Sequence, residues 1–185
     1  LAQPYSQSAD VKLVLANAAQ AAGLSARAVQ EARAAYAIAP DSARAALTAA
    51  QYLQASDRPA ALALLQDFVA RHPTVADTRL AYARLLIADG KFDAARSEFQ
   101  FLLQADPKNP DLVYSMALLS MQGKLPADAR TYLQRYLELI SQMDDERAGT
   151  RPVEPAYLYL AQIAEDDKQF PTALEWLRKI DGGEE

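Results

Sequence analysis

Between residues 76 and 109 the chain carries two short amphipathic patterns, one directly after the other. Apolar residues recur three or four positions apart in each, the spacing that places side chains on one face of an α-helix. Gly90 separates the two patterns, and Pro107 stops the second. The segment is therefore predicted to be a helical hairpin with two apolar stripes: Leu80, Ala83, Leu86 and Ile87 in its first helix, and Ala95, Phe99 and Leu102 in its second.

The same pattern occurs five times along the chain. An alanine recurs in each second helix at intervals of 33, 34, 34 and 44 residues, and another lies twelve residues before it in each first helix. Small residues at both places let the two helices of a hairpin cross closely. One such hairpin cannot bury its apolar faces alone, so the copies are expected to stack. The repeated alanines are Ala16, Ala49, Ala83, Ala117 and Ala161 in the first helices, and Ala28, Ala61, Ala95, Ala129 and Ala173 in the second.

This arrangement resembles the tetratricopeptide repeat, a helix-turn-helix unit of about 34 residues with small residues near positions 8 and 20 and a proline near position 32. Pro40, Pro73 and Pro107 close the first three copies. The tryptophan of position 4 is missing, and Arg79 stands there in the third copy. The resemblance implies an all-α, right-handed superhelical solenoid. The alternative is a generic alanine-rich helical bundle, against which the repeat register argues.

The whole chain, residues 1–185, is predicted to be one solenoid domain. Ser8, Ser25 and Asn109 are candidates for capping helices with a side-chain oxygen. The second helix of the fourth copy has no proline at its end and is expected to be longer than the others. The first residue is not methionine and no capping helix follows the last copy, which suggests a fragment of a longer protein. The repeats are expected at 9–41, 42–75, 76–109, 110–143 and 154–185, with an exposed loop inserted at 144–153.

The composition argues against some classes of function and bears on the source and location of the protein. The net charge is −5 with acidic and basic residues interspersed, so the basic face that nucleic acid requires is not expected. There is no cysteine, and no apolar run approaches the roughly 20 residues of a membrane span. Arginine outnumbers lysine 13 to 6 and alanine is abundant, which is typical of a GC-rich bacterial genome. The compartment stays open, with a periplasmic or envelope-associated location favoured over the cytoplasm.

The residue types of catalytic and metal sites are scarce. His72 is the only histidine, and its place before Pro73 indicates a helix end more than a catalytic base. Asp144, Asp145 and Glu146 lack the ligand spacing of a calcium loop, so a solvated loop is the preferred interpretation. There is no phosphate-binding loop and no nucleophile motif. No enzymatic activity, cofactor or metal is therefore predicted.

The resemblance also implies where a partner would bind. In tetratricopeptide repeats the first helices line a concave groove, and positions 2, 5, 9, 12 and 13 commonly face it. The basic and asparagine residues of a chaperone-type carboxylate clamp are absent. The predicted groove residues are Asn17, Gln20, Leu53, Arg84, Ile87, Tyr114, Leu118, Met121, Gln162 and Glu165, with Leu13, Gln54, Leu80 and Leu158 at further positions of the same pattern.

Two functions follow as hypotheses. The first is a non-enzymatic scaffold that binds a segment of a partner protein in the concave groove, with Arg84 as its main cation and Tyr114 and Met121 as anchors. The alternative is a structural spacer or self-association solenoid within a larger cell-envelope assembly protein. A protein or peptide partner is expected under the first hypothesis, and homo-oligomers are expected under the second.

Overall fold

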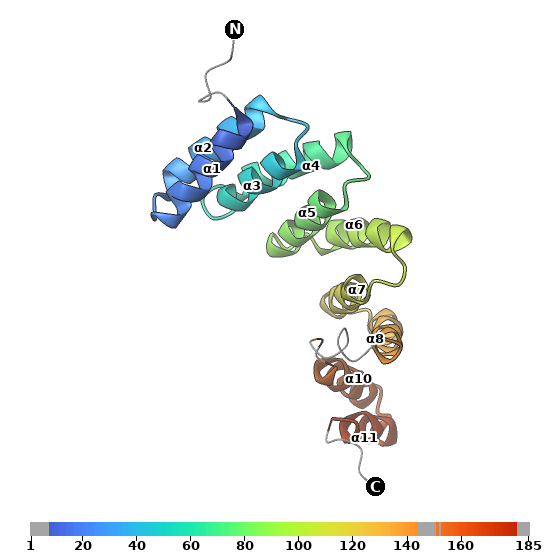
Figure 1. Cartoon of the computed structure of the whole chain (residues 1–185). Helices are drawn as coiled ribbons and strands as arrows, with labels where there is room; N and C mark the ends of the chain where they lie inside the picture. The colour runs from blue at the N-terminus through green and yellow to red at the C-terminus, as the bar shows by residue number, and fades with distance from the viewer. Residues whose placement is uncertain (1–7, 144–150, 152, 181–185) are drawn as a thin grey trace. The chain divides into compact units, whose positions relative to one another are not determined.

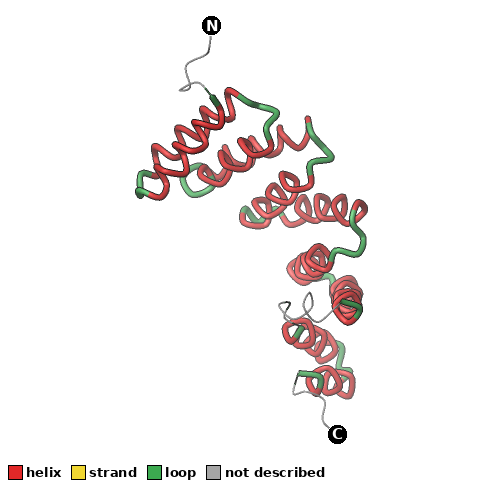
Figure 2. Tube along the Cα trace, viewed as in Figure 1, coloured by secondary structure: helices red, strands yellow, loops and turns green. Residues whose placement is uncertain are grey.

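A computed structural model describes residues 8–143, 151 and 153–180. The chain divides into two compact units, Leu1–Glu98 and Phe99–Glu185. Helices alternate with short connections in both, and the described residues contain no strand, as predicted (Figures 1 and 2). The first unit contains α1 (Ala9–Ala21), α2 (Ser25–Ile38), α3 (Ala43–Leu53), α4 (Arg58–Arg71) and α5 (Ala76–Ala88), and α6 (Phe92–Ala105) begins in it.

In the first unit, helices α1 to α5 pack on one another in succession. α1 packs on α2 and α3 packs on α4, which forms the expected hairpins. Each later first helix also packs on both helices of the hairpin before it, since α3 contacts α1 and α2, and α5 contacts α3 and α4. The repeated alanines have no solvent exposure in these helices, which fits the prediction that small residues permit close crossing: Ala16, Ala28, Ala49, Ala61 and Ala83.

The helix ends of this unit follow local rules. Ser42 caps α3 by accepting a hydrogen bond from the Ala45 N–H at 3.3 Å, and Asp57 caps α4 by accepting one from Ala60 N–H at 3.1 Å. Ser8 occupies the cap position of α1 but its side chain makes no capping hydrogen bond. Ser25, predicted as a cap, is instead the first residue of α2, and Leu24 occupies the cap position.

The second unit contains the later copies. Asn109 caps α7 as predicted, and the Asp111 and Leu112 N–H groups donate to its side chain. The second helix of the fourth copy, α8 (Pro126–Ser141), has 16 residues and is longer than the other described helices, as predicted. The inserted loop lies largely outside the described residues, but Arg151 donates from Nε and Nη2 to Asp111 at 3.0 and 3.1 Å. The helices of this unit are α7 (Pro110–Gln122), α8 (Pro126–Ser141), α10 (Glu154–Asp166) and α11 (Phe170–Arg178), and α7 packs on α8, α8 on α10, and α10 on α11.

Four of the five described turns within the hairpins contain a left-handed residue. Gly23 and Gly90 both have φ of 74°, which glycine adopts without steric cost. At the equivalent places of the last two copies Lys124 and Lys168 have φ of 54° and 60°. In the fourth copy Gly123 is the C-cap of α7, and the left-handed conformation falls on Lys124, the residue after it.

The unfolding free energy is expected to fall as the pH rises through about 10. Burial raises the pKa of four tyrosine hydroxyls above the ordinary value of 10.0, so the unfolded chain loses these protons at lower pH than the folded chain. Urea unfolding at neutral and alkaline pH tests this. The loss should be smaller in Tyr114→Phe, and an unchanged loss would contradict the contribution of that residue. The four residues are Tyr36, Tyr82, Tyr114 and Tyr136.

Candidate functional site

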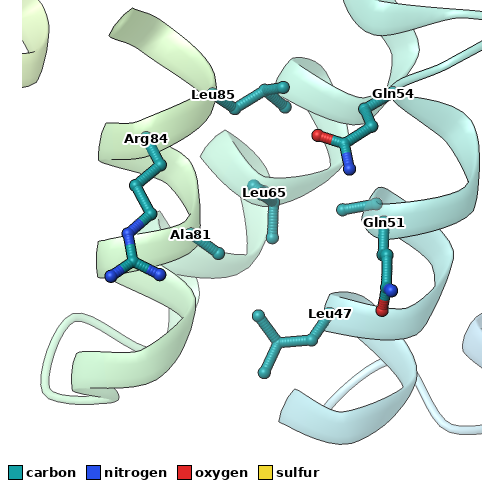
Figure 3. Close-up of a pocket in the computed structure, with 8 residues that line it drawn as sticks. Leu47, Gln51, Gln54, Leu65, Ala81, Arg84 and Leu85 are labelled. Atoms are coloured by element: carbon teal, nitrogen blue, oxygen red, sulfur yellow. The ribbon is translucent and has the colours of Figure 1, made fainter. Parts of the chain in front are cut away.

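A small hollow lies between α3 and α5 in the first unit and contains the predicted groove residue Arg84 (Figure 3). Gln54, which belongs to the same predicted pattern, lines the opposite side. Both side chains are exposed. The helices are held in place because α3 and α5 pack on each other and both pack on α4.

The hollow has an apolar floor and a polar rim. Its volume is about 270 Å³, below the roughly 300–1,000 Å³ of pockets that enclose a small molecule. A hollow of this size suits an anchoring side chain of a polypeptide better than a whole cofactor. The floor is lined by Leu47, Ala50, Leu65, Ala81 and Leu85, and the rim by Gln51, Gln54 and Arg84.

Among the described residues that line this hollow, Arg84 alone is charged. Within the described part of the chain no carboxylate forms an ion pair with its guanidinium group, whereas Arg71 and Arg79 are both paired. The side-chain amides of Gln51 and Gln54 likewise have no hydrogen-bond partner among the described residues. The rim therefore offers a cation, amide donors and amide acceptors to a ligand.

The remaining predicted groove residues of the first unit are not all at the surface. Asn17 is exposed, and its side-chain oxygen accepts a hydrogen bond from the Tyr52 hydroxyl at 2.6 Å. Gln20 is also exposed, and Ile87 is half-buried. Leu53 is only 2% exposed, as is Leu13, because other side chains of the helical core cover both. The structure therefore places these two leucines in the core, away from the exposed surface.

The predicted groove residues of the second unit lie on two helices, α7 and α10. Tyr114 is half-buried, and its ring packs on Tyr136 of α8 with centroids 4.8 Å apart, so it supports the hairpin. Leu118 and Met121 are half-buried on α7. Gln162 and Glu165 are exposed on α10 and line a second, open hollow together with Leu158.

Sequence reasoning missed part of the first hollow. Leu47 and Gln51 precede Gln54 at spacings of seven and three residues, which places the three side chains along one side of α3. Ala81 precedes Arg84 by three residues and Leu85 follows it, so α5 contributes a similar stripe. Following the same helix faces for up to two turns from Gln54 and Arg84 would have found Leu47, Gln51 and Ala81.

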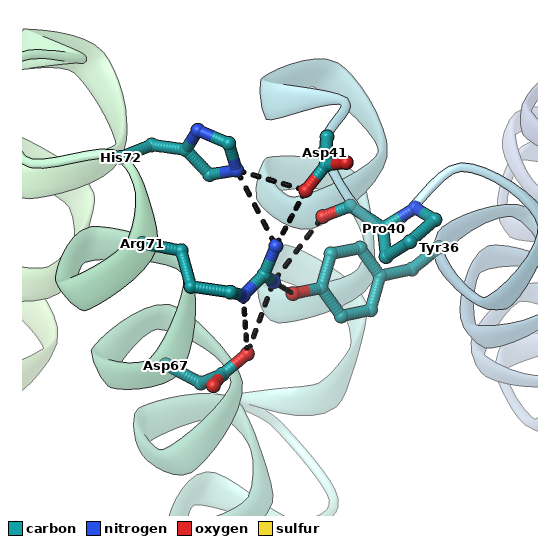
Figure 4. Close-up of polar contacts among 6 residues, drawn as sticks. All are labelled: Tyr36, Pro40, Asp41, Asp67, Arg71 and His72. Carbon is teal, nitrogen blue, oxygen red and sulfur yellow. Dashed lines mark hydrogen bonds and ion pairs between the residues drawn. The ribbon is translucent and has the colours of Figure 1, made fainter.

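A polar cluster ties α2 to α4 elsewhere in this unit (Figure 4). The Arg71 guanidinium donates to Asp67 at 3.0 and 3.1 Å and to Asp41 at 2.6 Å, and the hydrogen bond to Asp67 is the main cause that raises the pKa of Arg71. These groups largely satisfy one another, which indicates a structural connection. The cluster consists of Tyr36, Pro40, Asp41, Asp67, Arg71 and His72.

The described residues give little support for catalysis or metal binding. His72 lies at the C-cap of α4, in agreement with the predicted helix end, and its Nε2 is 3.0 Å from Asp41 Oδ1. No group of metal-ligating side chains is present among the described residues. Asp144, Asp145 and Glu146 lie outside them. Of the helices described, none combines the length and the apolar character needed to cross a membrane.

Comparison with protein families decides the classification. A sequence model described as tetratricopeptide repeat matches residues 52–100 and 86–149, which together cover more than half of the chain. The chain belongs to the tetratricopeptide repeat family. Such repeat proteins are generally non-enzymatic scaffolds with protein partners. No curated protein matches the sequence.

Solved structures of other tetratricopeptide repeat proteins show the same fold. MamA residues 41 to the end from Desulfovibrio magneticus RS-1 has a TM-score of 0.75 at 11% identity, covering 95% of this chain and 94% of its own. PilW, a type IV pilus biogenesis factor, has a TM-score of 0.70 at 20% identity, covering 96% and 79%. YrrB, a TPR protein with an unusual peptide-binding site, has a TM-score of 0.62 at 17% identity, covering 75% and 72%.

Proposed function

We propose that this chain is a non-enzymatic scaffold that binds an extended segment of a partner protein in the hollow between α3 and α5. The observation that carries the proposal is the exposed guanidinium of Arg84, which lacks a carboxylate partner among the described residues and stands beside an apolar floor. Arginine beside an apolar pocket is a frequent energetic centre of protein interfaces. The peptide-binding site of the structurally similar YrrB supports a peptide ligand.

The lining of the hollow defines the segment. An apolar side chain enters between Leu47, Leu65 and Leu85, where it is removed from water. An aspartate or glutamate nearby pairs with Arg84 through charge-assisted hydrogen bonds. The Gln51 and Gln54 amides bond to the peptide backbone, which contributes affinity for any sequence in extended form. The proposed ligand is therefore an acidic and apolar peptide segment.

Arg84→Glu is expected to weaken peptide binding at least about tenfold, because it replaces an attraction by a repulsion worth about 1.4 kcal/mol or more. Peptides are first selected from a displayed random library on the wild-type chain. Their affinity is then measured by fluorescence anisotropy for wild type and variant. We expect the selected peptides to combine an acidic residue with a large apolar one.

Lys108→Glu is the matched control, since Lys108 is exposed, carries the same charge and lies in the second unit. It should bind the peptides as the wild type does. Equal weakening by both variants would show that net charge alone matters. Failure to select any peptide, or full binding by Arg84→Glu, would contradict a binding site at this hollow.

A further inference from the structure

Among the described residues, no helix covers the last hairpin as the next first helix covers earlier ones. Leu177 lies four residues after the repeated alanine of α11 and is 40% exposed, whereas Leu65 and Leu133 at the same place are at most 1% exposed. In the first unit such a hairpin is covered by the next first helix, which packs on both of its helices. The groove between α10 and α11 is therefore shaped to receive a further first helix.

The walls of this groove show what it can bind. Each helix contributes a stripe at the i, i+3, i+4, i+7 spacing of an amphipathic face, and the volume between them is about 590 Å³. Of the described residues in its lining, Glu165 alone is charged. Leu158, Phe170 and Leu174 are all more than half exposed. The lining consists of Leu158, Ala161, Gln162 and Glu165 from α10, and Phe170, Ala173, Leu174 and Leu177 from α11.

The first hairpin exposes a matching face. Leu15 immediately precedes the repeated alanine of α1 and is 36% exposed, whereas Met116 and Leu160 at the same place in α7 and α10 are 1% exposed. Around it lies a hollow of about 210 Å³, whose described lining contains one charged residue, Arg27. The hollow is lined by Leu15, Ala18, Ala19, Ala22, Leu24 and Arg27.

We propose that the α1–α2 face of one copy docks in the α10–α11 groove of a second copy. α1 then takes the place of the next first helix, and the projecting Phe170 and Leu174 enter the hollow formed by small residues of α1. The single charges of the two linings, Arg27 and Glu165, are opposite. Because donor and acceptor surfaces differ, the contact is head-to-tail, and each copy retains one free surface for another.

Leu24→Asp and Leu174→Asp test the two sides separately. Both leucines are more than half exposed, so the fold should persist, and aspartate is a favoured residue at the helix cap position that Leu24 occupies. Leu125→Asp is the matched control, since Leu125 is likewise an exposed cap leucine, of α8, outside both linings. Circular dichroism establishes that each variant is folded.

Sedimentation velocity gives the readout, at chain concentrations up to about 0.5 mM. The wild type and Leu125→Asp should exceed the 20.2 kDa of one chain as concentration rises, whereas each interface variant alone stays at 20.2 kDa. An equimolar mixture of Leu24→Asp and Leu174→Asp should give dimers and nothing larger, because one intact surface remains on each chain. Neither lining includes Arg84, so peptide binding is a separate readout.

Three results would overturn the proposal. A wild type that stays monomeric at every concentration means that the groove serves another helix. Association that survives in Leu24→Asp but not in Leu174→Asp indicates a symmetric contact through α11. A mixture of the two variants that remains monomeric excludes the head-to-tail arrangement.

Discussion

Replacing Arg79 with leucine is expected to lower the unfolding free energy by about 2–4 kcal/mol. Arg79 is 8% exposed, and its guanidinium forms an ion pair with Glu98 of α6. Its Nε and Nη2 also donate to the Pro73 carbonyl at 3.3 and 3.0 Å. Leucine leaves a largely buried carboxylate without its cation and a carbonyl without its donors. Urea unfolding followed by circular dichroism measures the change.

Arg84→Leu is the control for this prediction. Arg84 lies on the same helix but is exposed, so its replacement should change stability by no more than about 0.5 kcal/mol. In the double variant Arg79→Leu, Glu98→Leu the carboxylate is removed as well, and part of the lost stability should return. If Arg79→Leu cost no more than Arg84→Leu, the pair with Glu98 would have no structural importance.

Arg79 illustrates what the sequence could not predict. The family resemblance places a tryptophan at its position, and nothing in the repeat pattern indicates that an arginine there is buried. Its burial depends on Glu98, nineteen residues further along, and on the backbone oxygen of Pro73. Periodicity identifies which face of a helix is apolar, but it does not identify which distant carboxylate makes a buried cation acceptable.

The fold itself was predictable because it depends on local signals. Alternating helices follow from apolar spacing, and the close crossings follow from alanines that recur twelve residues apart, such as Ala49 and Ala61. Turns were less certain, because Lys124 adopts a left-handed conformation that glycine usually provides. The sequence places apolar residues in the last hairpin but does not give their burial: Phe170, expected in its core, is 58% exposed.

The candidate site was predictable only in part. Arg84 and Gln54 came from the family pattern and do line one hollow. Leu53 follows the same pattern, yet it is buried, because a helical stripe that borders a groove turns into the core within one residue. Tyr114 packs on Tyr136, which no spacing rule indicates. The pattern thus defines the helix face, and packing selects the residues that remain accessible.

Ala61→Leu is expected to destabilise the chain by about 1–3 kcal/mol. Ala61 and Ala49 have no solvent exposure where α4 packs on α3, so three further heavy atoms require the helices to separate or side chains to leave their rotamers. Ala63→Leu on the same helix is exposed and should stay within about 0.5 kcal/mol of the wild type. Urea unfolding of both variants compares the same chemical change at a crossing and at the surface. Equal stabilities of the two variants would mean that the alanines recur only because alanine is abundant in the chain. A loss of stability confined to Ala61→Leu would show that the close crossing of α3 and α4 requires a small residue.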